Sequence, residues 1–295
     1  MHRPDPHPHR FDLADQAGYA RWREAKLAQF PRSLDELLVE LRDLEQPTAA
    51  ERNALLSRLR RANLVLYHCP LTEHRGALLR FAEQFGLLQP DRNPAADDDG
   101  LSAIRVNDVT HSGEFIPYTD RALRWHTDGY YNPPARRIRA FLLHCVRPAA
   151  EGGVNTLLDP EILYLRLRDE NPEWVAALMH PRAMCIPAHV EDGVELRPQQ
   201  YGPVFEVDAA GSLHLRYTAR TRSIAWRDDP ATRAALARLE EMLASPLPEV
   251  FSHRLESGQG LLCNNVLHGR SAFRDGPGPG RLLYRARFLQ RVQGT

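Results

Sequence analysis

The chain of 295 residues has little cysteine and no excess of charge of either sign. Its four cysteines, Cys69, Cys145, Cys185 and Cys263, are scattered and form no Cys-x-x-Cys pair. This spacing argues against a disulfide framework or a cysteine zinc site, and it favours reduced thiols in the cytoplasm. The 38 basic residues balance 38 acidic residues, so nothing indicates a nucleic-acid partner or an anionic membrane surface.

Long hydrophobic runs are also missing. No apolar stretch is long enough to span a bilayer, so we expect no membrane association. Residues 1–10 are rich in histidine and proline and lack the apolar core of a signal peptide. We expect a disordered tail over residues 1–15 and, because the hydrophobic content of 43% suffices for a large core, a single domain over residues 16–295.

The first part of this domain carries helical signals. Residues 18–30 are amphipathic, and Ser33-Leu34-Asp35-Glu36 and Thr48-Ala49-Ala50-Glu51 have the pattern of a capping box. A capping box pairs a hydroxyl with a carboxylate three residues later at the start of a helix. We therefore predict a helical N-terminal extension over residues 16–63.

From residue 101 onward the pattern changes to short strands. Two helices interrupt the series, each opened by an Asp-Pro pair, at Asp159-Pro160 and Asp229-Pro230. The pattern predicts a mainly β protein with flanking helices, whose core is a double-stranded β-helix (jelly roll) with a helical N-terminal part. The polar segment 187–201 is a candidate lid. The predicted strands are 64–69, 101–109, 139–146, 154–158, 203–207, 213–217, 249–255, 260–264 and 281–290.

Three residues carry the strongest chemical signal. His126 and Asp128 are two apart in a candidate strand, so their side chains face the same way. His268 follows the strand 260–264 and would stand at a strand end. Two histidines and one carboxylate that leave the opposite face open suit Fe(II) that also binds a co-substrate and O2. His189-Val190-Glu191 has the same spacing, but it lies between Pro187 and Asp192-Gly193 and is predicted to be a loop.

A second signal is a row of arginines downstream. Arg281, Arg285 and Arg287 differ by even numbers in the last predicted strand, so they face one way. If that face is buried, each guanidinium needs an anion, and a guanidinium binds a carboxylate through two parallel hydrogen bonds. Thr156, after the Gly152-Gly153 turn, could share that carboxylate. The alternative is a row of surface arginines that face solvent.

The ordered set of these motifs resembles the Fe(II)/2-oxoglutarate-dependent dioxygenases of the taurine dioxygenase superfamily over most of residues 60–290. Within that superfamily, the segment 126–129 is similar to glutarate hydroxylase, and Tyr130-Tyr131 together with 267–270 is similar to γ-butyrobetaine hydroxylase. The matching pieces are 64–69, 125–128, Gly152-Gly153 with Thr156, 264–270, Arg281 and Arg285.

The resemblance implies roles for individual residues. His126, Asp128 and His268 would bind iron, and Arg281 would bind the C5 carboxylate of 2-oxoglutarate with help from Thr156. Arg285 would contact either the co-substrate or an anionic substrate. The implied reaction uses Fe(II), 2-oxoglutarate and O2 to hydroxylate a small, charged metabolite with release of succinate and CO2. Related halogenases have a small residue where this chain keeps Asp128, which favours hydroxylation.

Substrate contacts are expected next to the ligand pair. The candidates are Tyr130, Tyr131, Asn132, Tyr217 and Arg220. Aromatic faces there could surround a quaternary ammonium group, or the rings could simply pack in the barrel. Two other functions fit the same residues: a jelly-roll metal-dependent hydrolase or isomerase of cupin type, and a non-catalytic 2-oxoglutarate-binding protein. The partner expected in each case is a small molecule, with a homo-oligomer possible through the N-terminal helices.

Overall fold

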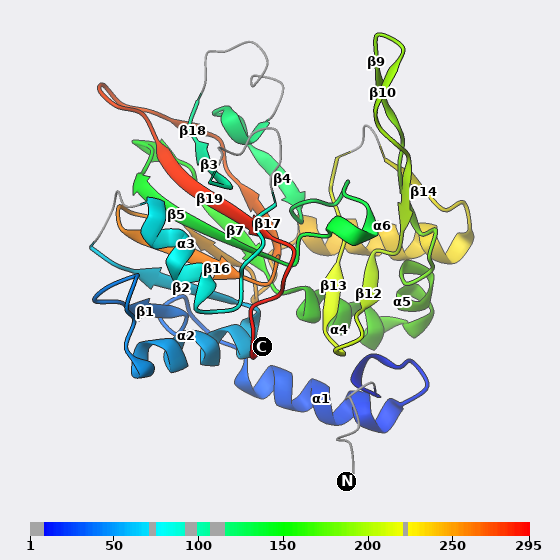
Figure 1. Cartoon of the computed structure of the whole chain (residues 1–295). Helices are drawn as coiled ribbons and strands as arrows, with labels where there is room; N and C mark the ends of the chain where they lie inside the picture. Colours follow the sequence, from blue (N-terminus) through cyan, green and yellow to red (C-terminus); the bar gives the residue numbers. More distant parts are fainter. Residues whose placement is uncertain (1–8, 71–74, 92–98, 107–115, 221–223) are drawn as a thin grey trace.

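The computed structural model describes residues 9–70, 75–91, 99–106, 116–220 and 224–295. Over these residues helices lie on both sides of the β-sheet core and below it (Figure 1). The α-helices are α1 (Gln16–Gln29), α2 (Ala49–Ala62), α3 (Arg75–Glu83), α4 (Pro160–Glu170), α5 (Pro172–Leu178) and α6 (Pro230–Ala244). Three short 3-10 helices are η1 (His9–Phe11), η2 (Ile116–Tyr118) and η3 (Pro134–Arg136).

Two sheets form the core. The larger has the order β1-β2-β16-β5-β19-β3 and the smaller β15-β7-β17-β4. Strands of the larger sheet are β1 (Leu38–Glu40), β2 (Leu64–His68), β16 (Gln259–Cys263), β5 (Ala140–Arg147), β19 (Leu282–Phe288) and β3 (Leu101–Ile104). Strands of the smaller sheet are β15 (Phe251–His253), β7 (Asn155–Leu158), β17 (Leu267–Arg270) and β4 (Leu123–His126).

Short pairs and a three-stranded sheet complete the fold. They are β11-β8-β14, β12-β13, β10-β9 and β18-β6. Their bounds are β6 (Glu151–Gly152), β8 (Met184–Ile186), β9 (His189–Glu191), β10 (Val194–Arg197), β11 (Gln200–Gly202), β12 (Phe205–Val207), β13 (Leu213–Leu215), β14 (Ala225–Trp226) and β18 (Phe273–Arg274).

The side chains of the larger sheet alternate between two apolar cores. Leu64 and Leu66 belong to the core that also holds Leu267 of the smaller sheet. Val65 and Tyr67 belong to a second core beneath α2 and α3. Because successive strand residues point to opposite faces, a sheet covered on both sides needs apolar residues at every position. The predicted jelly roll with a helical N-terminal part is confirmed.

The N-terminal region confirms one predicted helix boundary and corrects another. Thr48 and Glu51 form the expected capping box at the start of α2. The helix predicted after Ser33 is wrong, because residues 38–40 form β1, parallel to β2. Leu37, Val39 and Leu41 are all buried. Burial of every second residue is the period of a strand, and pairing with β2 overrides the local capping pattern.

The disordered tail expected over residues 1–15 is wrong for residues 9–15. Residues 1–8 lie outside the described residues, whereas residues 9–11 form η1. Phe11 is buried and makes edge-to-face contacts with Trp22 and Tyr164. Burial of this ring orders the chain before residue 16.

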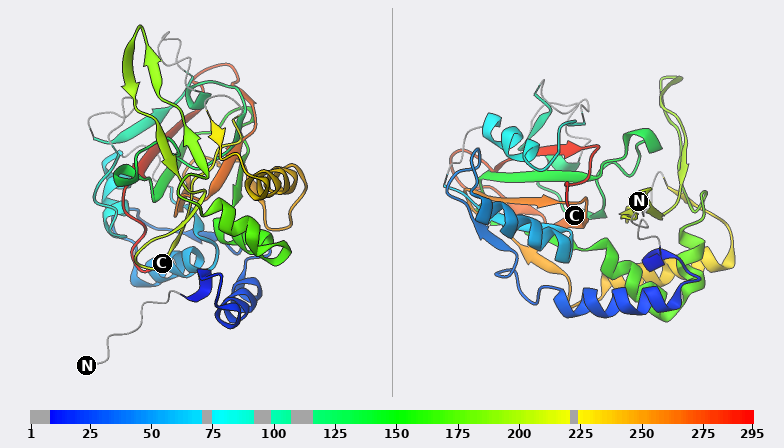
Figure 2. Two further views of the ribbon diagram at one scale, coloured as in Figure 1. Left: turned by 90° about the vertical axis from the view of Figure 1, so that its right-hand side faces the viewer. Right: turned by 60° about the horizontal axis from the view of Figure 1, so that its bottom comes forward.

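The loop predicted for the segment that contains His189 and Glu191 is also wrong. The predicted loop is strand β9, which pairs with β10 across the Asp192-Gly193 turn. This hairpin projects from the body of the protein (Figures 1 and 2). Gly193 has a φ of 76°, which a tight hairpin turn requires.

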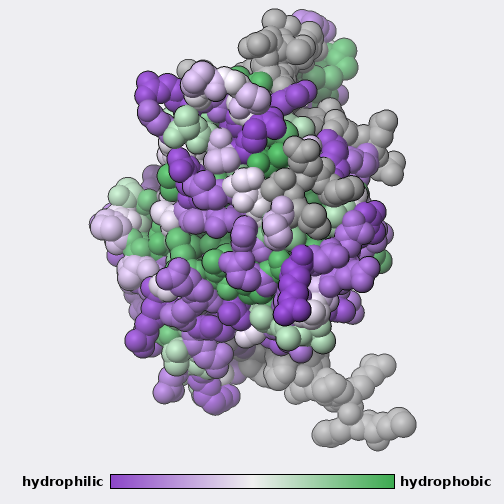
Figure 3. All heavy atoms as spheres, turned by 90° about the vertical axis from the view of Figure 1, so that its left-hand side faces the viewer, coloured by the Kyte–Doolittle hydropathy of each residue, from purple (hydrophilic) through white to green (hydrophobic). Residues whose placement is uncertain are grey.

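Hydrophilic side chains dominate the surface on the side of α2 and α3, and apolar residues form a central band there (Figure 3). Within the described ranges, no helix is long and apolar enough to cross a membrane.

A buried ionic cluster joins α1 to the start of α4. The ammonium of Lys26 lies 2.6 Å from carboxylate oxygens of both Asp159 and Glu161. Asp159 also accepts a hydrogen bond from the Asn63 side chain and from the backbone of Glu161. Lys26 is therefore the cation that two buried carboxylates share, and it fixes α1 against the barrel.

We expect Lys26→Ala to lower the free energy of unfolding by about 3–5 kcal/mol, because it leaves buried carboxylates without their cation. Arg23→Ala on the same helix is the matched control, since Arg23 pairs with Asp169 at the surface and should change stability by less than about 1 kcal/mol. Urea denaturation of both variants measures the difference. Equal, small effects would contradict this account of the cluster.

Candidate metal centre

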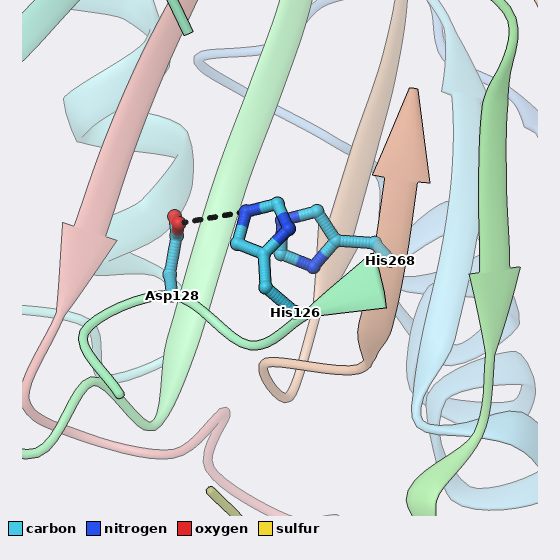
Figure 4. Close-up of side chains that lie close together, drawn as sticks. All are labelled: His126, Asp128 and His268. Carbon is cyan, nitrogen blue, oxygen red and sulfur yellow. Dashed lines mark ion pairs between the residues drawn. The ribbon is translucent and has the colours of Figure 1, made fainter. Parts of the chain in front are cut away.

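His126, Asp128 and His268 come together at one end of the smaller sheet (Figure 4). One ligand atom from each residue lies within 4.8 Å of the other two. His126 and His268 are direct cross-strand partners on β4 and β17, and their ring centroids are 4.2 Å apart. The His126 Nε2 atom is 3.8 Å from Asp128 Oδ1. No other such cluster of potential ligands occurs in the described part of the chain.

Asp128 lies two residues past His126, just beyond the end of β4. The Thr127 amide donates a hydrogen bond to the carbonyl of Tyr217, and a turn begins at Asp128. Gly129 then turns the chain with a φ of 66°. A Cβ at that position would lie 2.4 Å from Ile138, so only glycine fits the turn.

Backbone contacts orient both imidazole rings. The Nδ1 atom of His126 is 2.8 Å from the carbonyl of Arg124, and the Nδ1 atom of His268 is 2.8 Å from the carbonyl of Val266. A carbonyl only accepts, so Nδ1 carries the proton in each ring and Nε2 presents its lone pair. A neutral imidazole held in this way is the form that binds a metal.

Asn265 holds the backbone of Asp128 in place through hydrogen bonds. The sequence did not predict this role for Asn265. Its side chain accepts a hydrogen bond from the Asp128 amide and donates to the carbonyls of Asp128 and Ile138. Asn265 has a positive φ of 49°, a conformation that asparagine tolerates better than most residues. The Asn264-Asn265 pair shortly before His268 was the available signal.

The charges around Asp128 favour its ionised form. Burial alone would raise its pKa, but Arg285 and Arg287 outweigh burial and hold the pKa below the usual value. Arg285 Nη1 lies 3.4 Å from Asp128 Oδ1. The second oxygen, Oδ2, is buried and has no hydrogen-bond partner. An ionised carboxylate with one unpaired buried oxygen is suited to bind a cation.

The predicted arginine row lies on the inner side of the larger sheet. Arg285 and Arg287 alternate with Ala286, which faces the outer core. Arg287 donates to Asp91 at 2.6 Å and to the Tyr131 hydroxyl at 3.2 Å. The predicted surface alternative is wrong for Arg287 and for Arg281, which are 5% and 4% exposed.

Arg281 precedes β19 and lies beside the Gly152-Gly153 turn. Its Nε would be 3.5 Å from a Cβ on Gly153, and its Nη1 is buried with no hydrogen-bond partner. Burial lowers the pKa of Arg281 to about 10, still far above neutrality. A buried guanidinium of this kind needs an anionic partner.

Thr156 faces away from the triad. On β17, His268 pairs with Leu157 and Gly269 pairs with Thr156. Directly paired residues share a face, so the Thr156 hydroxyl lies on the side opposite His268. Asn155, one residue earlier, lines a small cleft together with Arg281 and Gly153. The Asn155 Nδ2 atom donates a hydrogen bond to the carbonyl of His253 at 3.3 Å, and the role of Thr156 as a partner of the carboxylate held by Arg281 stays a prediction.

The residues expected to contact the substrate differ in their exposure and in their contacts. Tyr130 and Tyr131 are half-buried and meet edge to face with centroids 5.2 Å apart. Tyr217 is 1% exposed and stacks on Trp226, so the structure gives its ring a packing role. Asn132 bonds the carbonyl of Arg136 in a turn, and Arg220 is exposed.

Comparison with known proteins identifies the protein family and the enzyme class. Residues 26–287 match the family described as "Taurine catabolism dioxygenase TauD, TfdA family". The chain belongs to this family. The predicted enzyme class, a 2-oxoglutarate-dependent non-haem iron dioxygenase, is confirmed, as is the expected requirement for Fe(II), 2-oxoglutarate and O2.

Two similar proteins are named uridine-5'-phosphate dioxygenase. The protein from an Amycolatopsis species is 29% identical over 171 residues, which cover 56% of this chain and 60% of that protein. The protein from a Streptomyces species is 32% identical over 215 residues, which cover 69% of this chain and 75% of that protein.

Solved structures of other oxygenases share the fold. Asparagine oxygenase has a TM-score of 0.58 at 18% identity and covers 94% of this chain and 85% of its own. A taurine dioxygenase from Burkholderia xenovorans has a TM-score of 0.58 at 17% identity and covers 88% of this chain and 89% of its own. The local similarities to glutarate hydroxylase and γ-butyrobetaine hydroxylase, the cytoplasmic location and the homo-oligomer stay predictions.

The metal-free dioxygenase should lose stability as the pH falls below 6.5. Burial, reinforced by His268, lowers the pKa of His126 from 6.5 to about 3. Below pH 6.5 the His126 side chain binds a proton in the unfolded chain but not in the folded site. Protonation therefore lowers the free energy of unfolding by about 1.4 kcal/mol per pH unit for this group.

The measurement is urea denaturation with a chelator present, at several pH values between 7 and 5. His126→Gln removes one of the titrating groups, so its stability should fall less steeply than that of the unmodified protein. Parallel pH dependences for the two proteins would show that His126 is not the group responsible.

Proposed function

We propose that this dioxygenase hydroxylates a small anionic metabolite, with His126, Asp128 and His268 as the ligands of Fe(II). The observation that carries the proposal is the convergence of two Nε2 lone pairs and an unpaired carboxylate oxygen. Three ligands on one side leave the opposite side of a metal free for a co-substrate and O2. When bound, iron supplies the activation of O2 that amino-acid side chains cannot provide.

The protein's own residues would position and neutralise the reactants. Backbone carbonyls fix both imidazole rings, and Asn265 holds the Asp128 backbone. Arg285 compensates the charge of Asp128 from the side. These contacts keep the ligands in place before the metal arrives, so that little reorganisation accompanies binding.

Arg281 and Asn155 would hold the distal C5 carboxylate of 2-oxoglutarate. The unpaired buried Nη1 of Arg281 supports this role, because a carboxylate would satisfy both its charge and its hydrogen bond. Asn155 lines the same cleft, and its Nδ2, which also donates to the carbonyl of His253, has a second hydrogen to donate. Thr156, on the opposite face of β7, would support the strand rather than contact the acid.

For the substrate we propose a phosphate-bearing metabolite of the size of a nucleoside monophosphate. The names of the two uridine-5'-phosphate dioxygenases support this choice. Tyr130 and Tyr131, next to the triad, would supply ring faces for a flat substrate. Arg220, exposed near the end of the bridge between Thr218 and His126, would meet the anionic group.

The two alternative functions are less well supported. A cupin-type hydrolase or isomerase has no use for a buried arginine beside the metal site, and the family match is to dioxygenases. A non-catalytic protein that binds 2-oxoglutarate would have no need for an intact triad.

The proposed function is tested by succinate release from the protein with Fe(II), 2-oxoglutarate and ascorbate. Uridine-5'-phosphate should stimulate succinate release more than uridine or taurine does, and mass spectrometry should detect an oxidised product. His126→Ala and Asp128→Ala should abolish turnover because each removes a ligand. His189→Ala, in the hairpin that carries the other His-x-Glu pair, is the matched control and should remain active.

The ligand assignment, the substrate class and the reaction class can each be rejected by a different result. Full activity of His126→Ala would reject the ligand assignment. Succinate release that no phosphate-bearing compound stimulates would reject the substrate class but keep the reaction class. Tight 2-oxoglutarate binding without any turnover would favour the non-catalytic alternative.

Arg281→Gln should weaken 2-oxoglutarate binding by about 2–5 kcal/mol, the cost of removing one partner of a buried charge pair. Asn155→Ala should raise the KM for 2-oxoglutarate more than Thr156→Val does, because Asn155 lines the cleft beside Arg281 and Thr156 does not. The KM values at saturating Fe(II) measure both effects. A larger effect at position 156 would restore the threonine as the partner of Arg281.

A further inference from the structure

A second polar cavity lies away from the triad, at the junction of α1, α2 and the C-terminal segment. Its volume is about 230 Å³. Figures 1 and 2 place α1, the end of α2 and the C-terminus next to one another on this side of the protein. The cavity shares no residue with the metal site, and five basic side chains line it: Arg10, Lys26, Arg60, Arg61 and Arg291.

Carboxylates neutralise only part of this charge. Glu161 lines the cavity, and Asp159 lies behind it; both contact Lys26 at 2.6 Å. Glu161 is also 4.0 Å from Arg10. These two carboxylates therefore balance Lys26 and Arg10.

Arg61 also has a carboxylate of its own. Its Nη2 atom lies 2.8 Å from Glu36. Counted over side chains alone, five positive groups less three carboxylates leave a charge of plus two.

Arg60 and Arg291 are the basic side chains of the cavity that have no ion pair in the described residues, although Glu161, Asp159 and Asp208 attract Arg291 from a greater distance. Arg60 donates only through Nε, to the carbonyl of Gly294 at 2.7 Å. Arg291 donates through Nη2 to the amide oxygen of Asn63, and its buried Nε has no partner. Within the described residues, neither guanidinium has a carboxylate within 4.0 Å. Two guanidinium groups from different elements thus face one small cavity.

We propose that this cavity binds a phosphate group, either free phosphate or a small phosphate monoester. Two guanidinium groups match the several oxygens of a tetrahedral dianion, whereas one guanidinium would suffice for a planar carboxylate. The volume suits a small anion, since pockets for drug-sized ligands are about 300–1,000 Å³. Trp22, which lines the cavity, provides an optical reporter.

The test is calorimetric titration of the full-length, metal-free protein with inorganic phosphate, against a chloride reference of equal ionic strength. A saturable, single-site isotherm is expected, with a change in tryptophan fluorescence that Trp22→Phe reduces. Arg60→Gln should weaken binding about tenfold or more, because it removes a charge-assisted hydrogen bond. Arg60 is exposed, so this variant should fold normally.

Two control variants locate the site. Arg52→Gln changes the charge by the same amount on the same helix, at an exposed residue that does not line the cavity, and should bind as well as the unmodified protein. Arg281→Gln tests for phosphate in the co-substrate cleft and should also leave binding unchanged. A parallel titration with β-glycerophosphate distinguishes a monoester from free phosphate, and tighter binding of either one supports the site.

Three results would overturn the proposal. They are no saturable binding, equal binding by Arg60→Gln, and a loss of binding in Arg281→Gln rather than in Arg60→Gln. None of these readouts depends on turnover, so failure here is distinct from failure of the proposed function.

Discussion

The pairing of β4 with β17 is the constraint on which the rest of the site depends. It places His126 directly opposite His268 although 142 residues separate them in the chain. A change of register by one residue would turn one ring to the other face of the sheet, and the triad would be lost. The hydrogen bond from the Thr127 amide to Tyr217, the Gly129 turn and the contact with Asn265 then bring Asp128 to the same point.

A short series of asparagines connects this site to the helical N-terminal part. Asn63 ends α2 and accepts a hydrogen bond from the side chain of Asn264. The next residue, Asn265, holds the backbone of Asp128. The helical extension is thus tied to the metal ligands by hydrogen bonds as well as by apolar packing, and Arg291 of the basic cavity contacts the same Asn63 oxygen.

Several basic side chains of this protein are buried or partly buried. Arg281, Arg285 and Arg287 lie on the inner side of the larger sheet, and Lys26 lies between α1 and α4. Lys26 and Arg287 have protein carboxylates at 2.6 Å, whereas Arg281 has a buried atom without a partner. Since an unpaired buried cation is costly, the residues that lack a protein anion indicate where external anions bind.

The sequence by itself determined the fold class, the triad and the arginine row, because each depends on local periodicity or on motifs with their own chemistry. It also predicted the N-caps at Thr48, Asp159 and Asp229, where a side chain bonds its own helix. The helix expected after Ser33 and the loop expected at His189 failed, because strand pairing decided both. Only the tertiary structure placed Asn155 and Arg281 along one small cleft, brought Asn265 against the backbone of Asp128, and gathered five basic residues around one cavity. Such relations depend on register and long-range contact, which no short stretch of sequence encodes.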